Sequence, residues 1–372
     1  MKKHVEAGDF PGATGLIARH GKIAYFETYG YQDRESKTPM AKDTIFRIYS
    51  MSKAITGVAV MALHEEGHFF LNDPVSKYLP DFAEMKVAVE QGEDVELVDA
   101  ERPITIRDLL RHTSGITYGG GGNAGKFYRE AEVGSKNHDL SEFTKRLGTV
   151  PLEFEPGTAW QYGYSIDVLG RLVEVVSGKT FDVFLEERIF QPLGMKDTAF
   201  HVPSNKHDRL VTLYSPDPDG GIRVATSAAQ DSYKQPAVFF SGGGGLVSTT
   251  MDYARFCQML LNDGALDGTR ILGKKSVELM RANHLGDIPR KGSLIARGGV
   301  GFGLTFAVTL DPGQTGALGS KGAYSWGGAA GTRFWIDPAE DMFCVFMVNI
   351  LPYGTLKYGD EFKLLAYQAI VD

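Results

Sequence analysis

Residues 50–66 read SMSKAITGVAVMALHEE, a run that predicts a helix with apolar side chains on nearly every face. A helix of this composition is expected at the centre of a domain, and Gly67 provides a suitable end to it. Lys53 is the charged residue of its first turns and lies three positions after Ser50. Because residues three apart share a helix face, we expect this hydroxyl and this amine to be neighbours.

Ser50 and Lys53 form an S-x-x-K motif whose chemistry depends on this placement. Backbone N–H groups at a helix start favour negative charge near the serine oxygen. Burying an ammonium is costly, so either the pKa of Lys53 falls or the amine has partners. A lysine of lowered pKa can act as the base for a serine. The structural alternative is that Ser50 caps the helix while Lys53 reaches the surface, and a chain of this length contains about one such motif by chance.

Composition excludes several classes of protein. The 372 residues are 43% hydrophobic and 23% charged, which is typical of globular chains and unlike disordered or coiled-coil ones. The net charge of −7, without a dense basic run, indicates no nucleic-acid partner. No apolar run is long enough to span a membrane, and no signal peptide follows Met1. The two cysteines, Cys257 and Cys344, suggest a reducing compartment, so we expect a cytoplasmic location.

Strand patterns occur at both ends of the chain. A hairpin is predicted from Ala13–Ala18 and Lys22–Tyr29, and further strands from Phe302–Thr309, Thr332–Ile336 and Met342–Val348. Segregated strands and helices indicate an α+β fold. We therefore predict an antiparallel sheet built from both chain ends and flanked by helices, with an inserted, mostly helical domain.

Helical patterns fill the middle of the chain and recur near its end. We assign residues 1–79 and 241–372 to a sheet domain and residues 80–240 to a helical domain, with the active site in the cleft between them. The predicted helices are Ile106–Arg111, Ser141–Leu147, Ser165–Val176 with Ser165 as its N-cap, Thr180–Phe190, Thr249–Asn262 and Lys357–Val371.

Two further motifs do not fit their chemistry. His64-Glu65-Glu66-Gly67-His68 matches the zinc-protease string, but Gly67 places His68 beyond the helix end, so the two imidazoles would not share a face. Residues 120–125 match a dinucleotide-binding string, but no strand precedes them. No serine lies in a G-x-S-x-G elbow, which argues against an α/β-hydrolase. We therefore expect neither a metal nor another cofactor.

Further motifs accompany the serine–lysine pair along the chain. Together and in this order they resemble those of the serine β-lactamase and penicillin-binding-protein superfamily, and most of all the family VIII carboxylesterases, which share the class C β-lactamase fold. The resemblance extends from about Gly12 to the final helix. The motifs are Ser50-Met51-Ser52-Lys53, Leu109-Leu110-Arg111-His112-Thr113-Ser114-Gly115, Pro156-Gly157, Trp160-Gln161-Tyr162, Gly242-Gly243-Gly244-Gly245-Leu246 and Trp326-Gly327-Gly328.

The resemblance implies a role for each matching residue. Ser50 would be the acylated nucleophile, Lys53 its proton partner and Tyr162 the catalytic tyrosine. The N–H groups of Ser50 and Ala329 would form an oxyanion hole, which stabilises the tetrahedral intermediate of acyl transfer. The alternative for Tyr162 is an ordinary half-buried tyrosine.

Trp326, Gly327 and Gly328 would replace the K-T-G strand of β-lactamases and bind the substrate; the alternative for Trp326 is a core indole. Two departures from the β-lactamase pattern matter. K-T-G is absent, and Tyr164 stands where the class C enzymes have Asn, two residues after the tyrosine. No anchor then remains for the carboxylate of a β-lactam, and an indole favours neutral, apolar substrates. We interpret residues 109–115 and 242–245 as structural and expect residues 242–245 to flank the cleft.

The sequence therefore predicts a serine carboxylesterase that hydrolyses short-chain acyl esters through an acyl-enzyme on Ser50, with weak β-lactamase side activity. The expected partner is a small-molecule ester, with no nucleic acid and no membrane; the oligomeric state is left open. Within the superfamily, a β-lactamase, a D-amino-acid peptidase or an acyltransferase are the alternatives. A non-catalytic binding protein on this fold and a metalloprotease are the alternatives from other classes.

Overall fold

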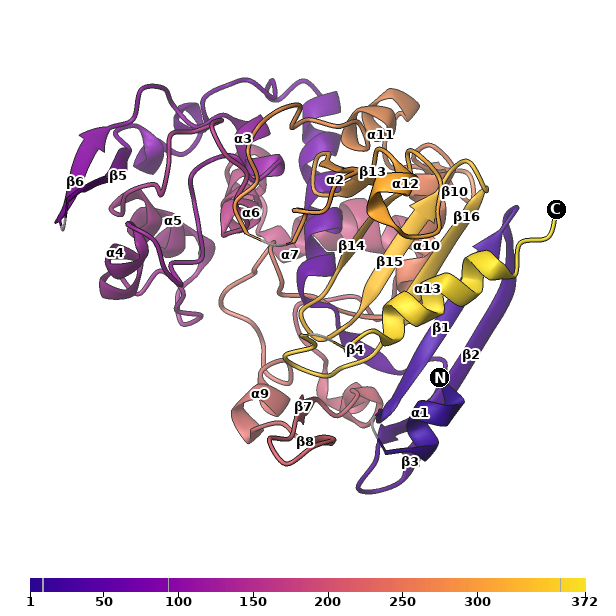
Figure 1. Ribbon diagram of the computed structural model, residues 1–372. Helices are drawn as coiled ribbons and strands as arrows, with labels where there is room; N and C mark the ends of the chain where they lie inside the picture. The colour runs from indigo at the N-terminus through magenta and orange to yellow at the C-terminus, as the bar shows by residue number, and fades with distance from the viewer. Residues whose placement is uncertain (9, 93, 293, 355) are drawn as a thin grey trace.

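The computed structural model describes residues 1–8, 10–92, 94–292, 294–354 and 356–372. Its largest element is an eight-stranded antiparallel sheet in the order β12-β13-β14-β15-β16-β1-β2-β3 (Figure 1). The predicted α+β sheet made from both chain ends is thereby confirmed. Its strands are β1 (Gly12–Arg19), β2 (Lys22–Asp33), β3 (Thr38–Pro39), β12 (Val300–Phe302), β13 (Ala307–Thr309), β14 (Tyr324–Gly327), β15 (Arg333–Asp337) and β16 (Met342–Met347).

The seam between β1 and β16 joins the two ends of the chain, with Leu16 opposite Val345. All six residues of β16 are buried, and they alternate between the two faces of the sheet. Val345 belongs to the core that includes α10 (Thr250–Leu261), whereas Phe346 belongs to the core beneath α13 (Tyr358–Gln368). Helices therefore cover both faces, which explains why β16 reads as a continuous apolar run.

The helix predicted from residues 50–66 is α2 (Ser52–Glu65), whose first twelve residues are all buried. It packs against α6 (Ser165–Ser177) in the centre of the molecule (Figure 1). Ser50 lies just before α2, in the 3₁₀ turn η1 (Tyr49–Met51). Tyr49 has a φ of 42°, a left-handed conformation that is strained for a non-glycine residue and is typical of functional sites. The helix ends before His68, so the zinc-protease string does not form its helical pair.

The middle of the chain is mostly helical but also contains two hairpins that the sequence did not predict. Figure 1 places the hairpin of β5 (Lys86–Gln91) and β6 (Asp94–Asp99) at the edge of the molecule, far from the main sheet. Most of its residues are exposed, and its two strands pair with each other rather than with the main sheet. The second hairpin consists of β7 (Tyr214–Pro216) and β8 (Ile222–Val224).

The remaining helices and turns of the described residues surround α2 and the sheet. They are α1 (Lys2–Glu6), η2 (Val75–Lys77), η3 (Pro80–Phe82), α3 (Ile106–Leu110), α4 (Gly125–Glu130), α5 (Leu140–Gly148), α7 (Phe181–Leu185), η4 (Glu186–Phe190), α8 (Gln191–Leu193), η5 (Ser204–Arg209), α9 (Ser227–Asp231), α11 (Lys274–Met280) and α12 (Pro312–Thr315). The remaining strands form the pairs β4 (Ile45–Arg47) with β9 (Val247–Thr249) and β10 (Ala265–Leu266) with β11 (Thr269–Arg270). Among the described residues, no helix combines the length and apolar character needed to cross a membrane.

Two local predictions were wrong. The strand expected at Phe302–Thr309 is a hairpin of β12 and β13, because Gly303 and Phe306 are joined by a 2.7 Å backbone hydrogen bond across the turn. Alternate apolar residues on both sides of this turn imitate one continuous strand. Ser165 does not cap α6: Tyr164 occupies the N-cap position, and Ser165 Oγ instead lies 2.8 Å from Ser114 Oγ.

Candidate active site

The amine of Lys53 is fully buried and surrounded by oxygen atoms. Its Nζ lies 3.3 Å from Ser50 Oγ, 3.1 Å from Tyr118 Oη and 2.5 Å from the carbonyl oxygen of Gly243. Lys53 therefore does not reach the surface, and the serine and lysine share one face as the spacing predicts. Three acceptors compensate the amine for its loss of water.

A buried carboxylate next to this group changes its electrostatics. Asp167, in the first turn of α6, accepts hydrogen bonds from Ser241 Oγ at 2.5 Å and from the N–H of Gly243 at 3.1 Å. Gly243 thus links the two charges, since its carbonyl accepts from Lys53. A Cβ at Gly243 would lie 2.5 Å from the carboxylate, so this close approach requires glycine.

Burial by itself lowers the pKa of Lys53, but the nearby oxygens of Tyr118, Tyr162 and Asp167 outweigh it and raise the pKa above its ordinary value. We expected a buried Lys53 to have either a lowered pKa or polar partners, and in the structure it has partners. Burial also raises the pKa of Asp167, although the Lys53 charge and two donated hydrogen bonds oppose this. Lys53 is accordingly an ammonium at neutral pH.

Tyr162 lies over the same amine, with Lys53 Nζ 4.5 Å from the centre of its ring. Its hydroxyl accepts a hydrogen bond from Trp326 Nε1 at 3.0 Å, and the two rings are 5.4 Å apart. The structure therefore brings together Ser50, Lys53, Tyr162 and Trp326. The indole donor therefore fixes the position of the phenol oxygen.

Tyr118 is a second phenol at the site, which the sequence did not predict. Its ring centre lies 5.6 Å from that of Tyr162, and burial raises the pKa of its hydroxyl although Lys53 opposes this. The two tyrosines meet because Gly163 lets their loops touch: a Cβ there would lie 2.3 Å from the carbonyl oxygen of Ile116. The glycine that follows Tyr162 is thus a packing requirement of the site.

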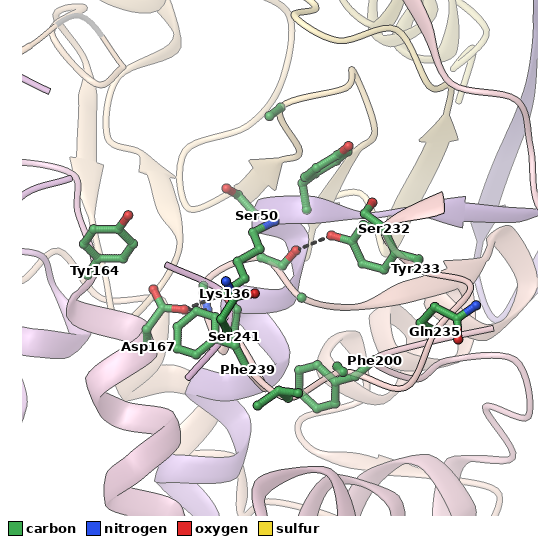
Figure 2. Close-up of a pocket in the computed structure, with 18 of the residues that line it drawn as sticks. Ser50, Lys136, Tyr164, Asp167, Phe200, Ser232, Tyr233, Gln235, Phe239 and Ser241 are labelled. Carbon is green, nitrogen blue, oxygen red and sulfur yellow. Dashed lines mark hydrogen bonds between the residues drawn. The ribbon is translucent and has the colours of Figure 1, made fainter. Parts of the chain in front are cut away.

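A cavity of about 420 Å³ opens at Ser50 (Figure 2). Ala329 also lines it, and no backbone acceptor for the N–H of Ala329 is found among the described residues. Trp326, Gly327 and Gly328 are not among the described residues that line this cavity. The lining is Tyr49, Ser50, Tyr118, Lys136, Asn137, Tyr164, Asp167, Phe200, Ser232, Tyr233, Gln235, Pro236, Ala237, Val238, Phe239, Ser241, Gly243, Gly244, Gly245 and Ala329.

His112 lies behind the tyrosines. It is fully buried, and neither ring nitrogen has a hydrogen-bond partner among the residues described. Its ring lies 4.7 Å from that of Tyr162 and 6.0 Å from that of Trp160. Burial, together with the charge on Lys53, holds the pKa of His112 well below its usual range. The imidazole is therefore neutral, and its ring packs against that of Tyr162.

Sequence reasoning missed Tyr118, Asp167 and Gly243 as members of the site. Tyr118 precedes a glycine-rich loop, and Asp167 has an ordinary explanation as a first-turn acid of α6. One signal was available: a lysine in a buried helix requires a counter-charge, and an acid in a neighbouring apolar helix is a natural source. Residues 242–245 were expected to flank the cleft, and three of these glycines line the cavity.

Comparisons with known proteins show the family to which the chain belongs. The Beta-lactamase family model matches residues 1–368. Esterase EstB of Burkholderia gladioli is 32% identical over 358 residues, covering 91% of this chain and 86% of EstB. The solved structure of EstCE1, a hydrolase with promiscuous acyltransferase activity, has a TM-score of 0.81 and 28% identity and covers 98% of this chain and 96% of its own.

A likeness of fold alone extends to simvastatin synthase (LovD) of Aspergillus terreus, with a TM-score of 0.85 at 23% identity over 100% of this chain and 97% of that chain. The resemblance to the family VIII carboxylesterases and the prediction of a serine hydrolase are both confirmed. The chain belongs to the Beta-lactamase family, and within its superfamily to the esterase-like serine hydrolases.

Proposed function

We propose that the protein is a serine carboxylesterase that hydrolyses short-chain acyl esters through an acyl-enzyme on Ser50. The observation that carries the proposal is the buried amine of Lys53, 3.3 Å from the oxygen of Ser50 where the cavity opens. A hydroxyl held beside a base is the arrangement with which enzymes form acyl intermediates. The esterase relatives support the same class of reaction.

In the first half of the proposed reaction, Ser50 Oγ attacks the ester carbonyl carbon. The serine proton passes to Lys53 and Tyr162, which must together have lost one proton beforehand. The N–H groups of Ser50 and Ala329 hold the oxyanion of the tetrahedral intermediate. The bond to the alcohol oxygen then breaks, and the same pair returns its proton to the leaving alcohol.

In the second half, a water molecule gives its proton to the pair and attacks the acyl-Ser50 ester, which releases the acid and restores the hydroxyl. Tyr118 and the carbonyl of Gly243 hold the amine in place between these steps. We assign substrate contact on the β14 side to Trp326, Gly327 and Gly328, and the indole also orients Tyr162. The steps use only groups of this chain.

A second candidate function is acyl transfer to an alcohol, favoured by the description of EstCE1 as a hydrolase with promiscuous acyltransferase activity. Acyl transfer occurs when an alcohol, in place of water, attacks the acyl-Ser50 ester in the second half of the reaction. Weak hydrolysis of β-lactams follows from the shared chemistry, but the missing K-T-G motif leaves it without the usual carboxylate anchor.

We also propose a cytoplasmic location for the protein. Its two buried free thiols, Cys257 and Cys344, suit a reducing compartment.

Rates on five substrates test the proposed function. We expect p-nitrophenyl acetate and butyrate to react faster than p-nitrophenyl decanoate, and much faster than a chromogenic cephalosporin or a D-Ala-D-Ala peptide. Adding an alcohol during butyrate turnover measures the partition between hydrolysis and transfer. A cephalosporin rate above the butyrate rate would replace the esterase by a β-lactamase.

A further inference from the structure

The cavity at Ser50 adjoins a second hollow of about 330 Å³, and Tyr118 and Tyr164 line both. The first cavity by itself falls in the usual size range of small-molecule sites, roughly 300–1,000 Å³. A substrate that reaches Ser50 therefore extends beside these two tyrosines toward the outer wall, which is formed by the end of α4 and the segment that follows it.

This outer wall carries two cations that have no ion-pair partner within the described part of the chain. Lys136 lines the first cavity, and Arg129 lines the second. Neither forms a salt bridge with a described acid, although Arg129 donates one hydrogen bond, to the carbonyl oxygen of Gly119 at 3.3 Å. Figure 2 shows Lys136 among the labelled side chains around Ser50.

The acids that line the two hollows are already compensated. Asp167 accepts from Ser241 and Gly243 and faces the charge of Lys53. Glu132, in the second hollow, pairs with Arg146 at 3.6 Å. The two hollows therefore present an excess of positive charge, in a chain whose net charge is −7. Uncompensated cations beside a site favour an anionic ligand.

We propose that the preferred substrate is an ester that carries a carboxylate away from the reacting carbonyl, with Lys136 and Arg129 meeting that charge. The inference rests on the proposed esterase function and narrows its substrate class. It differs from the neutral substrates that Trp326 suggests, because Lys136 and Arg129 line hollows to which Trp326 does not contribute. Phe200 and Phe239, which also line the first cavity, then pack against the apolar part of the same molecule.

Matched pairs of esters test this inference. Mono-p-nitrophenyl glutarate and p-nitrophenyl pentanoate have the same acyl length and differ by an acyl-side carboxylate. 4-Acetoxybenzoate and its methyl ester differ by a carboxylate on the alcohol side. For each pair the readout is the ratio of kcat/KM for the anionic ester to that for the neutral one, which separates charge recognition from the chemical step.

In at least one pair we expect the ratio to fall by roughly 3- to 10-fold in Lys136→Met or Arg129→Met, and further in the double variant, mainly through KM. The matched control is Lys145→Met, an exposed lysine of α5 outside both hollows, which should leave the ratio unchanged. Raising the salt concentration should lower the wild-type ratio, since exposed charges are screened.

Equal ratios in the wild type and the double variant, for both ester pairs, would overturn the inference. That result leaves the proposed function intact as long as the neutral esters are hydrolysed and the reaction depends on Ser50. If no ester of either pair is hydrolysed by the wild-type protein, the proposed function itself has failed, so the two failures are distinguishable.

Discussion

The start of α2 and the outer wall of the cavity are built in opposite ways. Lys53 is completely buried, and hydroxyl, carbonyl and carboxylate groups surround its amine. On the outer wall, Lys136 is exposed and has no ion-pair partner among the described residues. The chemistry therefore depends on a close-packed interior that tolerates little change, whereas selectivity depends on exposed loop side chains that can vary without altering the reaction.

The largest effect is expected from Ser50→Ala, which removes the proposed nucleophile from the buried region. Ester turnover should fall by roughly 10⁴- to 10⁶-fold, because the remaining groups cannot form the acyl-enzyme. Steady-state kinetics with p-nitrophenyl butyrate measure the loss, and Ser141→Ala, on α5 and outside the cavity, is the control. A variant that keeps more than a tenth of the activity would remove Ser50 from the mechanism.

The two phenols should differ in effect, because only Tyr162 is assigned a proton in the reaction. Tyr162→Phe should lower kcat by about 10²- to 10⁴-fold. In the double variant with Lys53→Ala, kcat should fall by far less than the product of the two single-variant reductions. Tyr118→Phe removes only one acceptor of the amine and should lower kcat by about 10-fold or less. A reversed order would make Tyr118 the proton carrier.

The pH dependence tests the electrostatics of the same region. The raised pKa of Lys53 keeps it protonated at neutral pH, so kcat/KM should rise as the pH increases above neutrality. Asp167→Asn removes an anion that raises this pKa, and the rising limb should move to lower pH by about one unit. The amide oxygen of Asn can still accept from Ser241 and Gly243. In Ser241→Ala, the control, the charge remains and the limb should stay where it is.

A pH profile that is identical in the wild type and Asp167→Asn would show that the carboxylate does not act on the lysine. Thermal unfolding of the wild type and of Asp167→Asn, measured alongside, checks that the variant is folded. A correctly folded Asp167→Asn protein with an unshifted limb contradicts the charge link through Gly243.

The smallest effect is expected at His112, in the protein's stability rather than its reaction. Its pKa is lowered in the folded state, so the unfolded chain binds a proton that the folded chain does not. Stability is then complete above the unfolded pKa of about 6.5 and falls as the pH drops below it. In His112→Phe the loss between pH 7 and 5.5 should be about 1 kcal/mol smaller than in the wild type. Urea unfolding at both pH values measures this difference, and equal losses would contradict a neutral buried imidazole.

Much of the fold was predictable because its signals are local. The apolar runs of residues 54–63 and of β16 indicate the buried helix and the central strand, and ordered motifs place Ser50, Lys53 and Tyr162. The failures came where local pattern and tertiary structure differ. The alternation from Phe302 to Thr309 continues across a turn, which the spacing of apolar residues does not reveal.

The rest of the site could not be predicted for a physical reason. Tyr118 and Gly243 contact Lys53 from 65 and 190 positions away along the chain. The segment of Tyr118 looks like an ordinary loop, and the motif that contains Gly243 does not reveal a contact with Lys53. Both contacts arise only when the loops pack together. The same holds for Lys136, because its charge can act on a substrate only when the fold places it beside the cavity of Ser50.

The most direct test of the central claim is intact-mass analysis of the protein after reaction with a fluorophosphonate, followed by peptide mapping of the adduct. We predict one adduct per chain, on Ser50, formed more slowly at pH 6 than at pH 9 and absent from Ser50→Ala. An adduct on any other residue, or no adduct in a protein that still hydrolyses p-nitrophenyl butyrate, would contradict the account.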